Sequence, residues 1–131
     1  MAREAGEQST PYILVVDDEW MSREMLETFL KMAGYRVGLA NSGERALTMA
    51  AEHPPDLIML DVNMTGMDGY EVCRHLRASE QMRDTPVLMV TAYEAAEDKQ
   101  QAAEVGATGL VIKPFDVQAL LAQIAFLLRD D

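Results

Sequence analysis

The chain has 131 residues, enough for one domain with a buried core and too few for two. Its formal net charge of −11 at pH 7 opposes binding to phosphate backbones, so we expect no direct nucleic-acid binding by this chain. No apolar run approaches the ~20 residues of a membrane span, and the polar start has no signal-peptide pattern. Cys73 is the single cysteine, which fits a reducing compartment, so we expect a cytoplasmic protein.

After a tail over residues 1–11, which we expect to be flexible, short apolar runs alternate with longer segments of helical periodicity. Most of the short runs are continuously apolar, as in strands buried on both faces, and the second alternates like a half-exposed edge strand. In chain order we expect strand 13–16, helix 22–33, strand 36–40, helix 41–52, strand 57–60, helix 68–78, strand 87–90, helix 96–105, strand 110–112 and helix 116–128.

Polar residues with capping spacing mark the start of three of these helices. Asn41 with Glu44, and Asp68 with Glu71, have the spacing of a capping box. Asp116 stands where it can cap the last helix. These signals predict where the three helices begin.

Five strand–helix units in a chain of this length predict an α/β domain with a parallel sheet and helices on both faces. Doubly wound sheets of this size commonly take the flavodoxin-like order 2-1-3-4-5, and we expect that order here. We assign this (βα)5 domain to residues 12–129.

Polar residues interrupt the apolar pattern at the end of four expected strands. Asp17 and Asp18 follow the first strand, Asp61 the third, Thr91 the fourth and Lys113 the fifth. Because the carboxyl ends of parallel strands lie along one edge of the sheet, these side chains should converge in one cleft. Each residue alone is an ordinary turn or cap residue, so it is their agreement that indicates a site.

Carboxylates placed this close repel one another and raise one another's pKa unless a cation joins them. Lys113 offers one positive charge, and Mg²⁺, which takes oxygen ligands, would offer two. A carboxylate can attack phosphorus to give an aspartyl phosphate, a reaction that depends on charge neutralisation and positioning. We therefore expect Asp61 to be the nucleophile, Mg²⁺ and Lys113 the counter-charges, and the Thr91 hydroxyl a donor to the phosphoryl oxygens.

With these residues in place, the sequence resembles the receiver domains of two-component response regulators, from about Tyr12 to Leu128. The resemblance implies a switch that a sensor histidine kinase or a phosphotransfer protein phosphorylates, and that is not a turnover enzyme. It rests on VVDDE at 15–19, LDVNM at 60–64, GMDG at 66–69, VTA at 90–92 and KPF at 113–115, together with the spacing between them.

The resemblance implies a magnesium site in which Asp18, Asp61 and the backbone carbonyl of Asn63 are ligands. It gives Asp17 a role through water and makes Asp61 the phosphoacceptor. Asn63 would also tune the lifetime of the phosphoryl group, together with Tyr93.

For the phosphoryl group itself, the resemblance implies binding by Thr91, by the backbone of Ala92 and by Lys113. It also implies a cis peptide bond between Lys113 and Pro114. In the family these groups surround the phosphorylated aspartate.

Two residues depart from the family pattern. Thr65 stands where the loop after the acceptor usually carries proline, which makes the loop less rigid. Leu110 stands three residues before Lys113, where the family usually has Tyr, Phe or His, whose ring swings inward with Thr91 on phosphorylation. Since leucine cannot form the same contacts, we expect Leu110 to give a different or weaker conformational readout.

The last expected helix is apolar beyond the stripe that faces the core, because it also carries Ala119, Ala122, Ala125 and Phe126. Helices that are apolar nearly all round bury a second surface. We therefore expect a homodimer or partner contact on the face made by the last two helices and the last strand.

Two other functions use a similar set of residues. Phosphatases of the haloacid dehalogenase type also combine an aspartate nucleophile with magnesium, but they need a second aspartate two residues later, where this chain has Asn63. A degenerate receiver that serves only as a docking module is the other alternative, and Thr65 and Leu110 keep it open.

Overall fold

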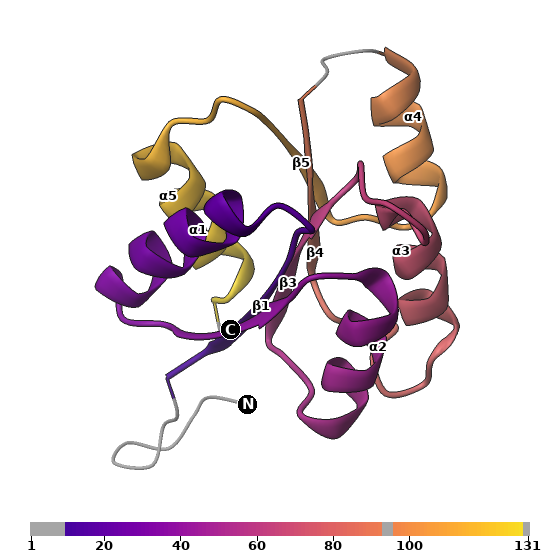
Figure 1. Ribbon diagram of the computed structural model, residues 1–131, viewed down its shortest axis with the longest axis horizontal. Coiled ribbons are helices and arrows are strands. Elements are labelled where there is room, and N and C mark those ends of the chain that lie inside the picture. Colours follow the sequence, from indigo (N-terminus) through magenta and orange to yellow (C-terminus); the bar gives the residue numbers. More distant parts are fainter. Residues whose placement is uncertain (1–9, 93–95, 130–131) are drawn as a thin grey trace.

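A computed structural model of the chain describes residues 10–92 and 96–129. Strands and helices alternate throughout this part (Figure 1). None of its helices is long and apolar enough to cross a membrane. The elements are β1 (Tyr12–Val16), α1 (Trp20–Met32), β2 (Arg36–Ala40), α2 (Gly43–Glu52), β3 (Leu57–Asp61), α3 (Gly69–Ala78), β4 (Val87–Thr91), α4 (Ala96–Glu104), β5 (Gly109–Ile112) and α5 (Val117–Leu127).

The strands form one parallel sheet in the order β2-β1-β3-β4-β5. This is the predicted doubly wound arrangement, so the predicted fold class and strand order are confirmed. β1, β3 and β4 lie in the interior of the sheet, and the burial of every residue of β3 and β4 explains why their sequences are apolar up to the polar last residue.

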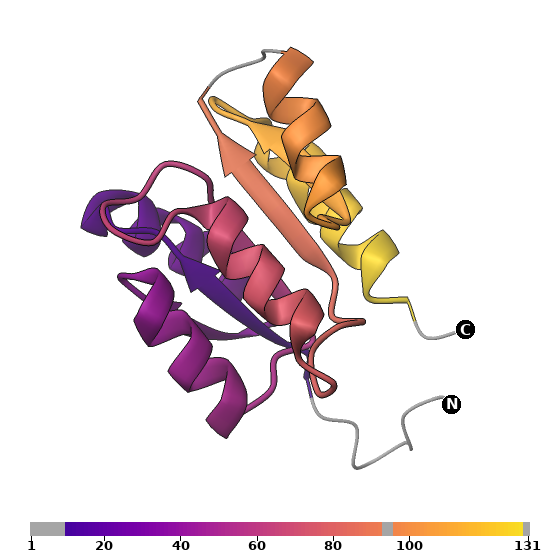
Figure 2. The same cartoon turned by 90° about the vertical axis from the view of Figure 1, so that its right-hand side faces the viewer.

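Two layers of helices cover the sheet, with α1 and α5 on one face and α2, α3 and α4 on the other (Figures 1 and 2). Successive residues of a strand point to opposite faces. In β1, Ile13 and Val15 therefore pack against the α1 and α5 layer, and Leu14 and Val16 pack against the other layer. The two cores hold the sheet rigidly between them, so the edge that carries the polar strand ends has fixed geometry.

Two of the three predicted caps are present. Asp68 forms the capping box of α3 with Glu71, through backbone-to-carboxylate bonds of 3.1 and 3.0 Å. Asp116 accepts from the backbone N–H groups of two residues in the first turn of α5. Both predictions are confirmed.

The predicted cap of α2 at Asn41 is wrong by one residue. Ser42 is the cap, and its hydroxyl accepts from the backbone N–H of Arg45 at 3.1 Å. A capping box needs its acidic residue at the third helical position, and Glu44 occupies the second. Glu44 remains in the first turn, where its charge favours the helix dipole.

Helix α1 begins at Trp20, two residues earlier than the expected start at Ser22. Trp20 and Met21 are both largely exposed, so they add nothing to the apolar periodicity that marks the rest of the helix. Because α1 starts directly after the acidic pair, its first turns lie beside the polar edge of the sheet.

At the opposite end of the strands, Arg77 ties two connections to α3. Its Nε donates to the carbonyl of Gly106 at 2.9 Å, and its Nη1 donates to the carbonyls of Arg83 and Thr85 at 3.0 and 2.8 Å. The Arg77 guanidinium therefore supplies donors to carbonyls in the loops before β4 and β5, which would otherwise depend on water.

Candidate functional site

The register of the sheet brings the polar strand ends together. Val16 pairs with Leu60, so Asp17 and Asp61 follow on neighbouring strands. On the other side of β3, Thr91 ends β4 and pairs with Ile112, the residue before Lys113. The convergence that the sequence predicts at this edge of the sheet is therefore present.

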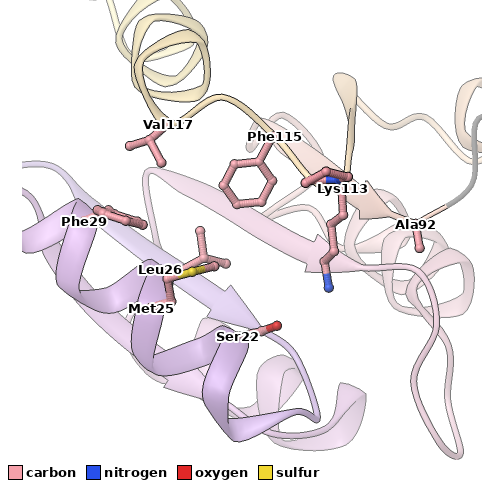
Figure 3. A pocket seen from close by; sticks show the side chains of 9 residues that line it. Ser22, Met25, Leu26, Phe29, Ala92, Lys113, Phe115 and Val117 are labelled. Carbon is pink, nitrogen blue, oxygen red and sulfur yellow. The ribbon is translucent and has the colours of Figure 1, made fainter.

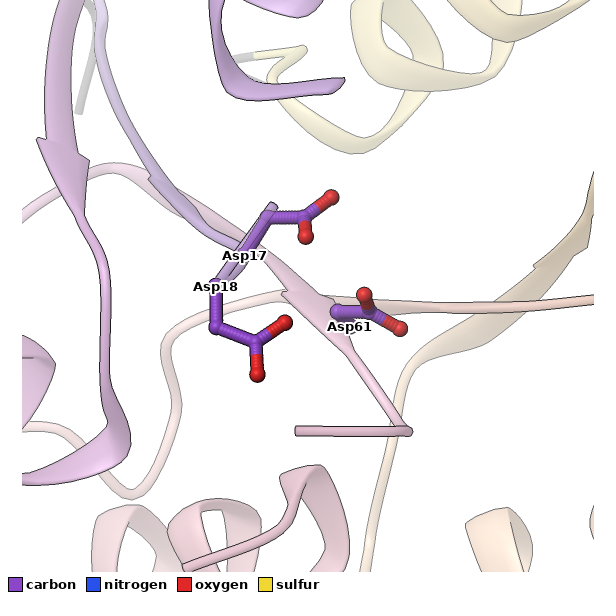
Figure 4. A group of neighbouring side chains, drawn as sticks. All are labelled: Asp17, Asp18 and Asp61. Carbon is purple, nitrogen blue, oxygen red and sulfur yellow. The ribbon is translucent and has the colours of Figure 1, made fainter. Parts of the chain in front are cut away.

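Three carboxylates form the centre of the site. Each of Asp17, Asp18 and Asp61 offers an oxygen, and these oxygens lie within 4.8 Å of one another. Figure 4 shows the first two at the end of β1, beside Asp61 at the end of β3. Asp17 and Asp61 are 2% and 8% exposed, whereas Asp18 is exposed. The cluster is thus open to solvent on the side of Asp18.

Backbone N–H groups fix each carboxylate. Asp17 Oδ1 accepts from the N–H of Glu19 at 2.9 Å, and Asp61 Oδ1 accepts from the N–H of Asn63 at 3.1 Å. Asp18 Oδ2 accepts from the N–H of Thr65 at 2.9 Å, which ties the loop after β3 to the loop after β1. The carboxylates are therefore oriented before any ligand arrives.

Lys113 brings positive charge to the cluster. Its Nζ lies 3.8 Å from Asp17 Oδ2 and 3.8 Å from Asp61 Oδ2, so the ammonium is shared between the two carboxylates. The backbone N–H of Lys113 donates to the carbonyl of Thr91 at 2.8 Å, which holds the end of β5 against the end of β4. The bond from Lys113 to Pro114 is cis, the isomer that the family resemblance implies.

The pKa of Asp61 is raised to about 6, first by burial and then by the negative charge of Asp17. The ammonium of Lys113 and the hydrogen bond from the Asn63 N–H act in the opposite direction but do not cancel the two effects. Keeping Asp61 ionised therefore costs folding free energy. A further cation in the cluster would reduce that cost.

The cluster fits a hard divalent cation. Its donors are carboxylate oxygens, the ligands that such ions prefer, and the cluster holds three carboxylates against the one ammonium of Lys113, so negative charge is in excess. A cleft of about 410 Å³ opens beside the cluster, lined by residues that include Asp18, Asn63 and Thr65. The residues present could therefore hold a metal ion together with some of its water.

Two residues that position the site do not stand out in the sequence as ligands or catalysts. A Cβ at Gly69 would collide with the carbonyl oxygen of Asp61 and lie 2.9 Å from the Cα of Val62. Glycine thus lets the start of α3 approach the backbone of the central aspartate closely. Arg23 Nη1 donates to the carbonyl of Asp17 at 2.8 Å and fixes the turn into α1.

The remaining predicted residues lie around this centre. Thr91 is 1% exposed, Ala92 follows it at the surface, and Asn63 is exposed in the loop after Asp61. Leu110 is half-buried, pairs with Met89 and packs against the core on the α2, α3 and α4 face. Tyr93 lies outside the described residues.

Comparisons with known proteins agree on one family. The family model described as the response regulator receiver domain matches residues 13–125. The DNA-binding dual master transcriptional regulator RpaA of Synechocystis is 42% identical over 91% of this chain and 49% of its own length. The response regulator MprA of Mycobacterium leprae is 44% identical over 89% of this chain and 50% of its own. The chain thus spans about half the length of these relatives.

Among solved structures, the chemotaxis protein CheY4 of Vibrio cholerae is 38% identical and superimposes with a TM-score of 0.88. The match covers 92% of this chain and 100% of that one. The likeness therefore extends over the sheet and both helical layers.

The raised pKa of Asp61 predicts a pH-dependent gain in stability for Asp61→Asn in the absence of divalent cations. The folded wild type favours protonated Asp61, which stabilises it at low pH. That contribution to the free energy of unfolding is lost as the pH rises from about 4 through about 6. At pH 8 the variant should be more stable than the wild type by up to about 3 kcal/mol, and the difference should narrow as the pH falls to 5.

Urea unfolding at several pH values measures this difference. Added Mg²⁺ should stabilise the wild type more than Asp61→Asn and so reduce the gap at pH 8. A gap that does not change with pH would contradict the electrostatic explanation.

Proposed function

This chain belongs to the family of response regulator receiver domains, and we propose that Asp61 is its phosphoacceptor. The observation that carries the proposal is the meeting of Asp17, Asp18, Asp61 and Lys113 at one edge of the sheet. Membership of the family sets aside the haloacid dehalogenase alternative. We take residues 12–129 as the receiver domain and place it in the cytoplasm, which suits the free thiol of Cys73.

In this proposal a carboxylate oxygen of Asp61 attacks the phosphorus atom in line with the bond to the leaving group. The Asn63 N–H holds Oδ1 at 3.1 Å and so fixes the direction of the carboxylate. Lys113 Nζ, 3.8 Å from Oδ2, neutralises the negative charge of the incoming phosphoryl oxygens. The hydroxyl of Thr91 and the backbone N–H of Ala92 would donate to those oxygens.

The resident metal in this proposal is Mg²⁺, held by Asp18, Asp61 and the backbone carbonyl of Asn63. When bound, it supplies positive charge that offsets the repulsion between carboxylate and phosphoryl oxygens. Asp17, the most buried of the three carboxylates, acts through water. The exposure of Asp18 favours direct ligation from the open side of the cluster.

The donor in this proposal is a phosphohistidine on a sensor histidine kinase or a phosphotransfer protein. The bond from the histidine nitrogen to phosphorus breaks, its electron pair stays on the imidazole, and a new bond joins Asp61 to phosphorus. Asn63 and Tyr93 would tune how long the phosphoryl group survives hydrolysis. The chain catalyses only its own modification and is not a turnover enzyme.

Intact-mass measurement after incubation with acetyl phosphate and Mg²⁺ tests the phosphoacceptor. We expect the wild type to gain one phosphate, and Asp61→Asn to gain none because it lacks the nucleophile. Asp84→Asn, at an exposed loop residue, is the matched control and should be modified like the wild type. Chelation of the metal should abolish the reaction. A wild type that stays unmodified would favour a module used only for docking.

We further propose that phosphorylation is read out without an inward-rotating side chain on β5. Leu110 pairs with Met89, and Thr91 lies two residues further along β4, so both side chains belong to the same face of the sheet. Leu110 is already packed against the core on that face and carries no ring or hydroxyl with which to follow Thr91.

Methyl NMR of Leu110, with and without beryllofluoride and Mg²⁺, tests this readout. We expect the Leu110 rotamer to stay the same when the phosphoryl mimic binds, because its apolar contacts would be lost by rotation. An inward rotation of Leu110 together with a shift of Thr91 would refute the proposal.

The partner surface in this proposal is the face of α4, β5 and α5. Phe126 of α5 is 60% exposed, and the Arg129 guanidinium lies 4.3 Å from the centroid of its ring. An exposed aromatic side chain of this kind often anchors an interface.

Phe126→Asp should weaken self-association or partner binding about tenfold, measured by sedimentation of the phosphorylated protein. Met32→Asp, at an exposed methionine on α1, should have no effect. A monomer in both phosphorylation states, with Phe126→Asp silent, would count against this surface.

A further inference from the structure

An apolar groove of about 600 Å³ runs between α1 and the segment that follows β5 (Figure 3). Met25, Leu26 and Phe29 of α1 face Phe115 and Val117 across it. Cavities that hold small organic ligands have volumes of ~300–1,000 Å³ and mostly apolar walls. The groove therefore has the size and the lining of a small-molecule site.

The groove is continuous with the phosphoacceptor site. Lys113 and Ala92 line one end of it, and the Lys113 ammonium also lies 3.8 Å from Asp61. Ser22 is the other polar side chain in the lining. Once a divalent cation offsets the carboxylates beside Lys113, an anion attached to an apolar body matches this distribution, because the positive charge is at one end and the hydrocarbon surface at the other.

We propose that the groove receives the apolar body of a small organic acyl phosphate, whose phosphoryl group is transferred to Asp61. The proposal rests on the proposed function and adds a preference among donors. The bond between Asp61 and phosphorus forms, the bond between phosphorus and the acyl oxygen breaks, and the carboxylate product leaves with the electron pair. No redox partner is needed.

The lining favours a hydrocarbon group over a polar one. A sugar or amide in the groove would place hydroxyl or N–H groups against Met25, Phe29 and Phe115, which offer no hydrogen-bonding oxygen, and such burial is unfavourable. A phenyl or alkyl group loses no hydrogen bond there and gains from leaving water. The donor class is therefore an acyl phosphate with an aromatic or longer aliphatic chain.

Phosphorylation rates with benzoyl phosphate and acetyl phosphate test the preference, with Mg²⁺ present and intact mass as the readout. The ratio of the two rates is compared between proteins, so the intrinsic reactivities of the donors cancel. Met25→Gln keeps the length of the side chain but makes the groove wall polar, and it should lower the ratio roughly fivefold to tenfold. Met32→Gln lies on the same helix outside the groove and should keep the wild-type ratio.

A binding measurement that needs no reaction checks the position, with Mg²⁺ present to offset the excess negative charge of the carboxylates. In protein with ¹³C-labelled methionine methyl groups, phenylphosphonate should shift the Met25 resonance and leave Met32 in place. Methylphosphonate, which has the same anionic group without the ring, should shift Met25 far less.

The outcomes separate this inference from the proposed function. Modification by both donors, with the same rate ratio in the wild type and Met25→Gln, would overturn the groove assignment and leave Asp61 as the acceptor. A Met25 resonance that does not respond to phenylphosphonate would also overturn it. Failure of both donors to modify the wild type would instead reject the phosphoacceptor.

Discussion

Repulsion between carboxylates at the end of β1 and the end of β3 is the constraint around which this structure is arranged. Asp17 and Asp61 are almost completely buried, and the ammonium of Lys113 stands 3.8 Å from each. That single charge does not compensate the cluster, since the pKa of Asp61 remains at about 6. A folded state that tolerates this cost needs a large core elsewhere, and the two helical layers supply it.

The same constraint explains the local backbone. Carboxylates that repel one another must be held from outside, and the N–H groups of Glu19, Thr65 and Asn63 do so. Gly69 allows α3 to begin directly against the carbonyl of Asp61, which leaves little freedom for the backbone of the central residue. The site is thus preorganised by loops and helix starts, while the sheet only sets the spacing.

Strand order and the convergence of the polar residues could be predicted from sequence because both follow from periodicity and from the parallel topology. Helix starts follow less directly from the local sequence. Ser42 and Asn41 are both good caps, and the capping-box spacing to Glu44 favours Asn41, whereas the helix uses Ser42. The close approach at Gly69 and the reach of Arg23 to the carbonyl of Asp17 depend on tertiary distances that no local pattern encodes. The groove beside Lys113 was missed for the same reason, since its walls come from α1 and from the segment after β5.

A phosphoryl group on Asp61 would replace one negative charge by about two, next to the buried Asp17. Lys113, now shared between two carboxylates, would then be drawn toward the phosphoryl oxygens. Its backbone N–H is bonded to the carbonyl of Thr91, so a shift of Lys113 acts directly on the end of β4. Among the described side chains of α4, which connects β4 to β5, only Ala102 is buried. Few buried contacts mean a low cost of local movement. Because Leu110 on β5 has no ring to rotate, α4 is the element best suited to move in response to the added charge on Asp61. Its movement would alter the surface that a partner contacts.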